Sequence, residues 1–288
     1  MDARTQYLME LAKRSVTAYL ANLKPRAVML TGSVAEGLCD EYSDCEVCFY
    51  YEELPSESEL RRAHSQNQGA KLIEILGDRH NGAFGETFLM NGVEFHFAHT
   101  TIWRWEREIF SILERFDVRS PLVKTMSGTL IGIPLYGEML IQKWKAQIAN
   151  YPDGLAQTMV EHYLKFFPLW GIHKKLIQRD TTLWYYQIII ESAQNLLGVL
   201  AGLNRLYYST FQFKRMGRFI AQMEVAPENF AARLESLFLH DAAVADRLEA
   251  LVRETVELVE RHMPQIDTSS ARQKLGWRQQ PWAIEIPG

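Results

Sequence analysis

A glycine, two serines and two acidic residues lie close together near the start of the chain. Gly32 and Ser33 end one apolar run, and Ser43, Asp44 and Glu46 open the next. A strand that ends in Gly-Ser before a helix can offer free backbone N–H groups and a hydroxyl to a phosphate. Because strand side chains alternate between faces, Asp44 and Glu46 face the same way and could share a cation such as magnesium. Taken singly, these signals also have ordinary explanations: a helix cap and two solvated acids on an edge strand.

A third acidic residue, Glu94, lies among apolar neighbours further along the chain. It follows the dipeptide Asn91-Gly92, and Asn-Gly between two β-type runs is the strongest short-range signal of a hairpin. Alternation then places Glu94 and His96 on one face of the predicted strand, and the phenylalanines beside them on the other. A strand with one solvated face would show the same pattern.

These residues can act together only if a sheet brings them side by side, and the apolar pattern predicts one. Helical spacing of apolar residues predicts a helix over Thr5–Leu23, and a polar stretch suits another over Ser56–Asn67. The predicted strands are Arg26–Leu30, Asp44–Tyr51, Lys71–Leu76, Thr87–Met90 and Val93–His99.

From about Gly137 onward, helical patterns replace the strands. They cover Leu155–Gln178, Thr182–Leu203 and Asp241–Arg261. The sequence therefore predicts an α+β fold, with a small mixed sheet flanked by helices over residues 1–136 and an all-α helical bundle domain over residues 137–288. The loop residues at 151–154 could also mark the boundary. The polar tail Asp267–Gly288 is expected to lack regular structure.

Composition narrows the class of protein. The 288 residues suffice for one large domain or two ordinary ones, and 47% apolar with 23% charged residues is typical of soluble globular chains. A net charge of -4 argues weakly against a protein whose main task is gripping nucleic acid. Three clustered cysteines do not make a disulfide framework. Without a signal-peptide block or a membrane-length apolar run, we expect a cytoplasmic protein of undetermined oligomeric state.

The order of the motifs resembles the nucleotidyltransferase superfamily typified by DNA polymerase β. The matching features are G-S-x-x-x-G at 32–37, S-D-x-E at 43–46, and a separate strand with Glu94 between apolar neighbours. Within that superfamily the chain looks like the antibiotic nucleotidyltransferases that adenylylate aminoglycosides or lincosamides. One departure is visible, because Glu46 stands where many members carry aspartate.

The resemblance implies a magnesium-dependent transferase whose catalytic residues and metal ligands are Asp44, Glu46 and Glu94. Residues 1–136 would be the nucleotidyltransferase catalytic domain, and residues 137–288 would bind substrate and nucleotide. Asp44 and Glu46 would hold the Mg²⁺ that grips a nucleoside triphosphate, with ATP as the expected donor. Glu94 would complete the metal site or act as the base on the acceptor hydroxyl.

The resemblance also implies nucleotide contacts in both halves of the chain. Gly32 and Ser33 would hold the β- and γ-phosphates, and Ser43 could assist. In the antibiotic enzymes, an asparagine or arginine on a helix and a downstream lysine reach the nucleotide. Asn204 and Lys214 are the corresponding candidates here, although a solvated basic face would equally explain Lys214.

The expected acceptor is a hydroxyl-bearing small molecule such as an aminoglycoside or lincosamide, and the negative net charge suits a cationic one. Two alternatives stay open: modification of a protein or RNA, and a nucleotide-binding module without catalysis. Glu191 could line an acceptor site or lie on a helix surface. A basic cluster, formed by His173, Lys174, Lys175 and Arg179, could contact phosphate or RNA, or could be a solvated helix face.

Overall fold

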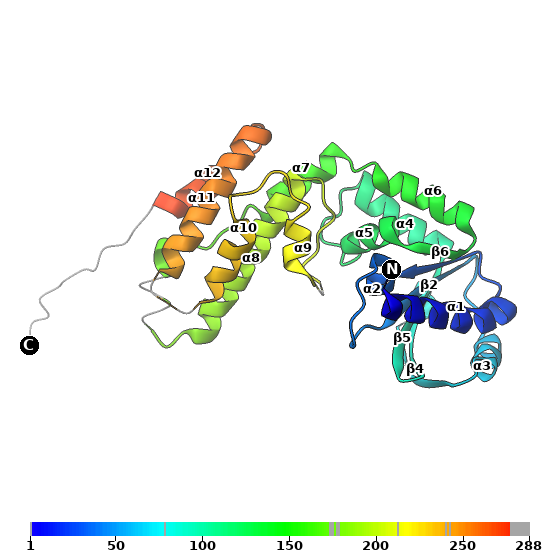
Figure 1. Cartoon of the computed structure of the whole chain (residues 1–288). Coiled ribbons are helices and arrows are strands. Elements are labelled where there is room, and N and C mark those ends of the chain that lie inside the picture. The colour runs from blue at the N-terminus through cyan, green and yellow to red at the C-terminus, as the bar shows by residue number, and fades with distance from the viewer. Residues whose placement is uncertain are drawn as a thin grey trace, which may run out of the picture. The chain divides into compact units, whose positions relative to one another are not determined.

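The computed structural model describes residues 2–77, 79–172, 176, 179–211, 213–239, 241 and 243–276 (Figure 1). The chain divides into two compact units, Met1–Arg115 with Lys124–Asn150, and Phe116–Val123 with Tyr151–Gly288. The boundary therefore falls at the 151–154 loop and not at residue 136. The reason is helix α6 (Glu138–Ala149), whose buried Trp144 lies against Tyr50 in the first unit, with ring centroids 4.6 Å apart.

The first unit is built on a six-stranded sheet in the order β3-β4-β5-β2-β1-β6. Only β2 and β5 run parallel among its neighbouring strands, so the sheet is mixed, as predicted. Asn91 and Gly92 both have positive φ, 53° and 79°, which confirms the predicted hairpin turn. The strands are β1 (Ala27–Thr31), β2 (Cys45–Tyr51), β3 (Ala70–Leu76), β4 (Ala83–Met90), β5 (Val93–Thr101) and β6 (Ile133–Tyr136).

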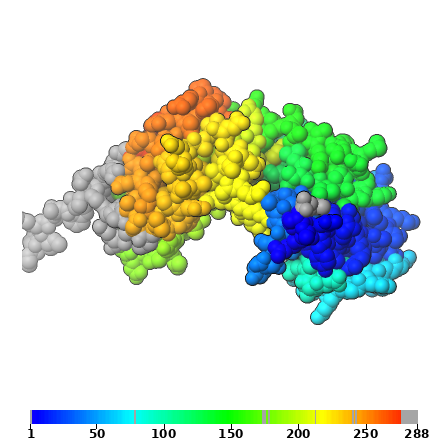
Figure 2. Space-filling model, viewed as in Figure 1, coloured from blue at the N-terminus to red at the C-terminus, as the bar shows by residue number. Residues whose placement is uncertain are grey.

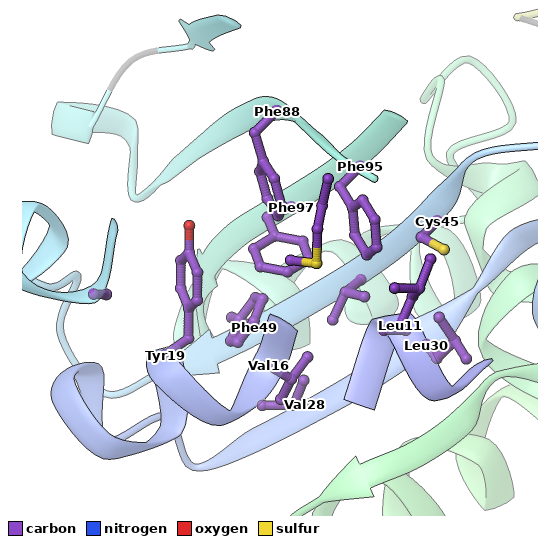
Figure 3. Packing of buried hydrophobic residues seen from close by; sticks show 14 of the residues in the cluster. Leu11, Val16, Tyr19, Val28, Leu30, Cys45, Phe49, Phe88, Phe95 and Phe97 are labelled. Atoms are coloured by element: carbon purple, nitrogen blue, oxygen red, sulfur yellow. The ribbon is translucent and has the colours of Figure 1, made fainter. Parts of the chain in front are cut away.

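Helices cover both faces of this sheet. The helices of this part of the chain are α1 (Ala3–Leu23), α2 (Gly32–Glu36), α3 (Glu57–Gln66), α4 (Ile102–Glu114), α5 (Val123–Ile131) and α6, with a 3-10 helix at Arg79–Asn81. On one face, α1 and α3 pack on the odd-numbered side chains of β2 and β5, including Phe49 and Phe97 (Figure 3). α1 is the dark blue surface of Figure 2, and its other side faces solvent. On the second face, Tyr50 packs against Trp105 of α4 and Trp144 of α6.

A polar cluster is buried on the face of the sheet that α1 and α3 cover. The carboxylate of Glu86 on β4 accepts a hydrogen bond of 2.9 Å from the Tyr19 hydroxyl. It lies 2.6 Å from His64 Nε2 and 3.1 Å from His99 Nε2. The Tyr51 hydroxyl lies 2.9 Å from the other ring nitrogen of His99. Buried charge is tolerated here because every oxygen of the carboxylate has a partner.

The second unit is helical, as predicted. Its helices are α7 (Asp153–Tyr163), α8 (Thr182–Leu203), α9 (Met216–Ile220), α10 (Phe230–Glu235), α11 (Val244–His262) and α12 (Ser269–Gly276), with a 3-10 helix at Ser236–Phe238. α7 and α8 approach closely because Gly198 and Gly202 have no side chains. A Cβ at Gly198 would overlap the ring of Tyr163, and one at Gly202 would crowd Val160. None of the helices in the described ranges is long and apolar enough to cross a membrane.

Two predictions about the helical half were wrong. The predicted helix Leu155–Gln178 ends at Tyr163, five residues before Pro168, because proline and the residue preceding it disfavour helix. The tail is not irregular throughout, since Ser269–Gly276 forms α12. Arg272 of α12 binds Glu260 of α11 through two nitrogens, at 2.9 and 2.5 Å. The tryptophans of the tail, Trp277 and Trp282, lie outside the described residues.

Candidate functional site

The turn after β1 brings the backbone directly against a carboxylate. Thr31, the last residue of β1, pairs with Glu46 of β2. Gly32 follows with a φ of 66°, a conformation that favours glycine. A Cβ at Gly32 would collide with the Glu46 carboxylate. Glycine is therefore required at position 32 both for its backbone angle and for the close approach of Glu46.

Ser33 carries a buried hydroxyl that is unsatisfied in the described part of the chain. Helix α2 begins at Gly32 and its N-cap residue is Thr31, so Ser33 is not the helix cap that the sequence also allowed. An unsatisfied buried polar group costs about 1–3 kcal/mol. A phosphate oxygen bound at this turn would offset that cost.

The acidic residues gather at the same end of the sheet. Asp44 directly precedes β2, and Glu46 lies on it opposite His96 of β5. His96 Nε2 lies 3.0 Å from Glu94 Oε1 and 3.5 Å from Asp44 Oδ2. The predicted alternation is correct, because Phe95 lies in the core on the opposite face of β5. Parallel pairing of β2 with β5 thus brings the third acid beside the first.

His96 was not predicted as a site residue. Its second nitrogen, Nδ1, lies 3.2 Å from Thr87 Oγ1 on β4. The ring is thereby held between strand β4 and the two acids, Asp44 and Glu94. The alternation that placed His96 beside Glu94 was visible in the sequence, but its approach to Asp44 depends on the pairing of distant strands.

The carboxylates fit magnesium in part. Their oxygens are ligands that Mg²⁺ prefers, and Asp44 is only partly buried, with its side chain 30% exposed. Within the described residues, however, no three His, Cys, Asp or Glu side chains stand together as ready metal ligands. Glu94 and Asp44 instead both contact His96 Nε2, at 3.0 and 3.5 Å. A magnesium site formed by Asp44, Glu46 and Glu94 stays a prediction.

Ser43 takes part in the turn that leads into the site. Its hydroxyl accepts a hydrogen bond of 2.9 Å from the backbone N–H of Asp40 and donates one of 3.0 Å to the Asp40 carboxylate. This fixes the chain just before Asp44. A contact between Ser43 and a nucleotide stays a prediction.

The two predicted nucleotide contacts of the helical half belong to the second unit. Asn204 is the C-cap residue of α8, and its side-chain amide makes four hydrogen bonds to the backbone. Its nitrogen donates to the carbonyls of Leu200 and Val225, and its oxygen accepts from the N–H groups of Glu224 and Val225, all at 2.7–2.8 Å. Both donors and both acceptor positions of the amide are thus engaged in tying a loop to the helix end. Lys214 is exposed in the segment before α9.

Glu191 lies on the exposed surface of α8, where Gln187 donates a 2.7 Å hydrogen bond to it. It borders a hollow of about 400 Å³ that is also lined by Lys165, Phe166, Phe167, Ile188, Ser192, Gln194 and Asn195. Of the predicted basic cluster, His173, Lys174 and Lys175 lie outside the described residues, and Arg179 is exposed. The hollow could hold a small polar molecule, but its chemistry is not that of the acidic site.

No protein-family model and no curated protein matches the chain. Among solved structures, it is similar to a nucleotidyltransferase-like protein from Exiguobacterium sibiricum, with a TM-score of 0.40 and 12% identity over 90% of this chain and 81% of that one. A similarity of this size does not establish a family.

Proposed function

We propose that the chain transfers a nucleotidyl group from a nucleoside triphosphate, with ATP as the first candidate, to a hydroxyl group, releasing pyrophosphate. The observation that carries the proposal is the meeting of the Gly32-Ser33 turn with Asp44, Glu46 and Glu94 at one end of the sheet. Phosphoryl-type transfer needs a phosphate cradle and a cation held beside it. The unsatisfied Ser33 hydroxyl and the carboxylates are suited to those two tasks.

The site residues have two proposed roles, phosphate binding and metal binding. Gly32 provides the positive φ of the turn and lets the Glu46 carboxylate approach the backbone, and Ser33 donates its hydroxyl to the phosphate oxygens. Asp44 and Glu46 would hold Mg²⁺. When bound, the ion supplies positive charge that offsets the charge developing on the phosphates.

Glu94 is the proposed base. Its carboxylate accepts the proton of the acceptor hydroxyl as the oxygen forms a bond to the α-phosphorus. The bond between the α-phosphorus and the oxygen bridging to the β-phosphate breaks, and pyrophosphate leaves. His96 is a positioning residue in this scheme, because it contacts Glu94 and is itself held by Thr87.

We propose a small hydroxyl-bearing acceptor, an aminoglycoside or lincosamide, on the strength of the motif order. The test is pyrophosphate release with Mg²⁺ and each nucleoside triphosphate, across a panel of both drug classes. Total RNA and a protein substrate mixture form separate arms, which detect the macromolecular alternatives.

Asp44→Ala is expected to abolish release. Glu41→Gln is the matched control, since Glu41 is a nearby exposed acid paired only loosely with Arg4, at 3.8 Å. Release that survives Asp44→Ala would refute the proposed site. No release with any acceptor would refute the transferase itself.

A further inference from the structure

The edge strand β3 carries more exposed apolar side chains than is usual for an edge strand. β3 is the end strand on its side of the sheet, and its residues after Ala70 are all exposed. Its large apolar side chains are 42–57% exposed: Leu72, Ile73, Ile75 and Leu76. In Figure 2 the cyan part of the first unit, which includes β3 in the colour bar, lies at the outside of that unit. An edge strand offers unpaired backbone groups to another strand, so proteins usually protect it.

The two edges of this sheet differ in that respect. β6, at the opposite edge, has four residues and contains Pro134, which has no N–H to donate to a further strand. β3 has seven residues and no proline. Its apolar side chains point to both faces of the sheet, which suits another strand better than a helix packed on one face.

A bulge in β3 places two opposite charges on the same face. Lys71 lies opposite Leu89 of β4, and Glu74 lies opposite Thr87, two residues from Leu89. Residues two apart on a strand share a face. Lys71 and Glu74 therefore share one, although they are three positions apart, because the bulge adds a residue between them. Leu72 lies between them on the other face.

We propose that two copies of the chain associate through β3, antiparallel and related by a two-fold axis at Leu72. Lys71 of each copy then lies opposite Glu74 of the other, twice in the interface. The two Leu72 side chains meet at the axis, and Ala70 lies opposite Ile75 of the second copy. Such self-complementarity is what a two-fold interface requires. Cross-strand pairs of opposite charges and pairs of apolar side chains both stabilise a sheet.

Charge favours this register over the ones on either side of it. An axis at Glu74 would place the two Glu74 carboxylates opposite each other. An axis at Lys71 would do the same with two ammonium groups. Like charges directly opposite destabilise a sheet. Bulges and charged side chains commonly protect an edge strand from pairing with other chains. Here the bulge and the two charges instead favour one defined partner, a second copy of the chain.

Charge reversal tests the pairing. By light scattering after size-exclusion chromatography, the wild type should have twice the 33.3 kDa mass of the chain. K71E and E74K should each weaken dimerisation by about tenfold or more, because both pairs become like-charged. An equimolar mixture of the two variants should recover the dimer, since every pair again joins an acid to a base. The double variant K71E/E74K should dimerise as the wild type does.

Leu72→Lys provides a test that does not depend on the ion pair. It puts two ammonium groups at the axis, and neither charge variant should rescue it. Circular dichroism checks that each variant is folded, and the mixture carries its own control because it contains the same chains. A wild type that is monomeric at every concentration would overturn the proposal. So would K71E and E74K variants that dimerise as strongly as the wild type.

Discussion

His96 Nε2 lies 3.0 Å from Glu94 Oε1, and this contact attaches the third acid of the site to an imidazole ring. Thr87 holds the ring from its other nitrogen, at 3.2 Å. A carboxylate fixed in one direction is better placed to take a proton from a hydroxyl than one that rotates freely. The relationship therefore favours the base role for Glu94, leaving Asp44 and Glu46 as the proposed metal ligands.

His96→Ala is expected to lower kcat for pyrophosphate release by about 10–100-fold, the usual cost of losing a residue that orients a functional group. KM for the nucleotide should change less than kcat, because His96 Nε2 lies closer to Glu94, at 3.0 Å, than to the proposed metal ligand Asp44, at 3.5 Å. His96→Gln keeps an N–H donor and should recover part of kcat. Glu94→Gln, which removes the base itself, should cost about 10²–10⁴-fold. A rise in nucleotide KM with normal kcat in His96→Ala would contradict the positioning role.

Gly32→Ala should remove nucleotide binding. The new methyl group would meet the Glu46 carboxylate, and the backbone angle of 66° is unfavourable for alanine. Gly69→Ala is the matched control. Gly69 also has a positive φ, 82°, but a methyl group there would meet only Asn91 Oδ1, at an ordinary 3.9 Å.

Both variants should lose similar stability, roughly 1 kcal/mol from the backbone angle, which thermal melts can compare. Only Gly32→Ala should weaken binding of a nucleoside triphosphate, measured by calorimetry without acceptor. Equal binding by the two variants would mean that the Gly32 turn does not hold the phosphates.

How much could be predicted from the sequence depended on how local each signal was. The Asn91-Gly92 turn is decided by two residues, and it was predicted correctly with the facing of Glu94 and His96. The approach of His96 to Asp44 was not predictable, because it requires β5 to lie parallel to β2. Nothing in the periodicity of either strand states which strand will be its neighbour.

Buried polar partners were missed for a related reason. The predicted strand began at Thr87, one residue after Glu86, and His64 lay in a predicted polar helix; only tertiary packing brings the two side chains to 2.6 Å. Asn204 was interpreted through a resemblance as a nucleotide contact. Three of its four hydrogen bonds to the backbone depend on the loop at Glu224 and Val225, some twenty residues away in sequence.

The Glu86 cluster predicts that the first unit loses stability in acid. Burial alone would raise the pKa of Glu86, but hydrogen bonds from His64 and His99 outweigh it and lower the pKa from 4.5 to about 2. That stabilisation is complete above pH 4.5 and is lost as pH falls towards 2. Burial lowers the pKa of His99 below its ordinary 6.5, so its contribution also declines as pH falls below 6.5.

Scanning calorimetry between pH 8 and 3 (roughly the span in which carboxylates and histidines titrate) should therefore show the transition of the first unit moving to lower temperature in acid. Glu86→Gln should lower stability at neutral pH by about 3–5 kcal/mol, because it leaves the buried partners of the carboxylate uncompensated. The same substitution should also make the transition temperature of the first unit depend less on pH in acid. Glu57 forms an exposed ion pair with Arg61, so Glu57→Gln should change neither the stability at neutral pH nor its dependence on acid. An unaltered acid profile in Glu86→Gln would show that other groups govern the transition.

Asn204→Ala separates a structural role from a nucleotide contact. The substitution removes four hydrogen bonds, each of which contributes about 0.5–1.5 kcal/mol to stability. The melting temperature of the second unit should therefore fall, while KM for the nucleotide stays within about twofold of wild type because no atom of the amide was available to the nucleotide. Lys214→Met is the comparison, since Lys214 is exposed and its loss should leave stability unchanged. A raised KM in Asn204→Ala, with a normal melt, would restore the nucleotide-contact interpretation of this residue.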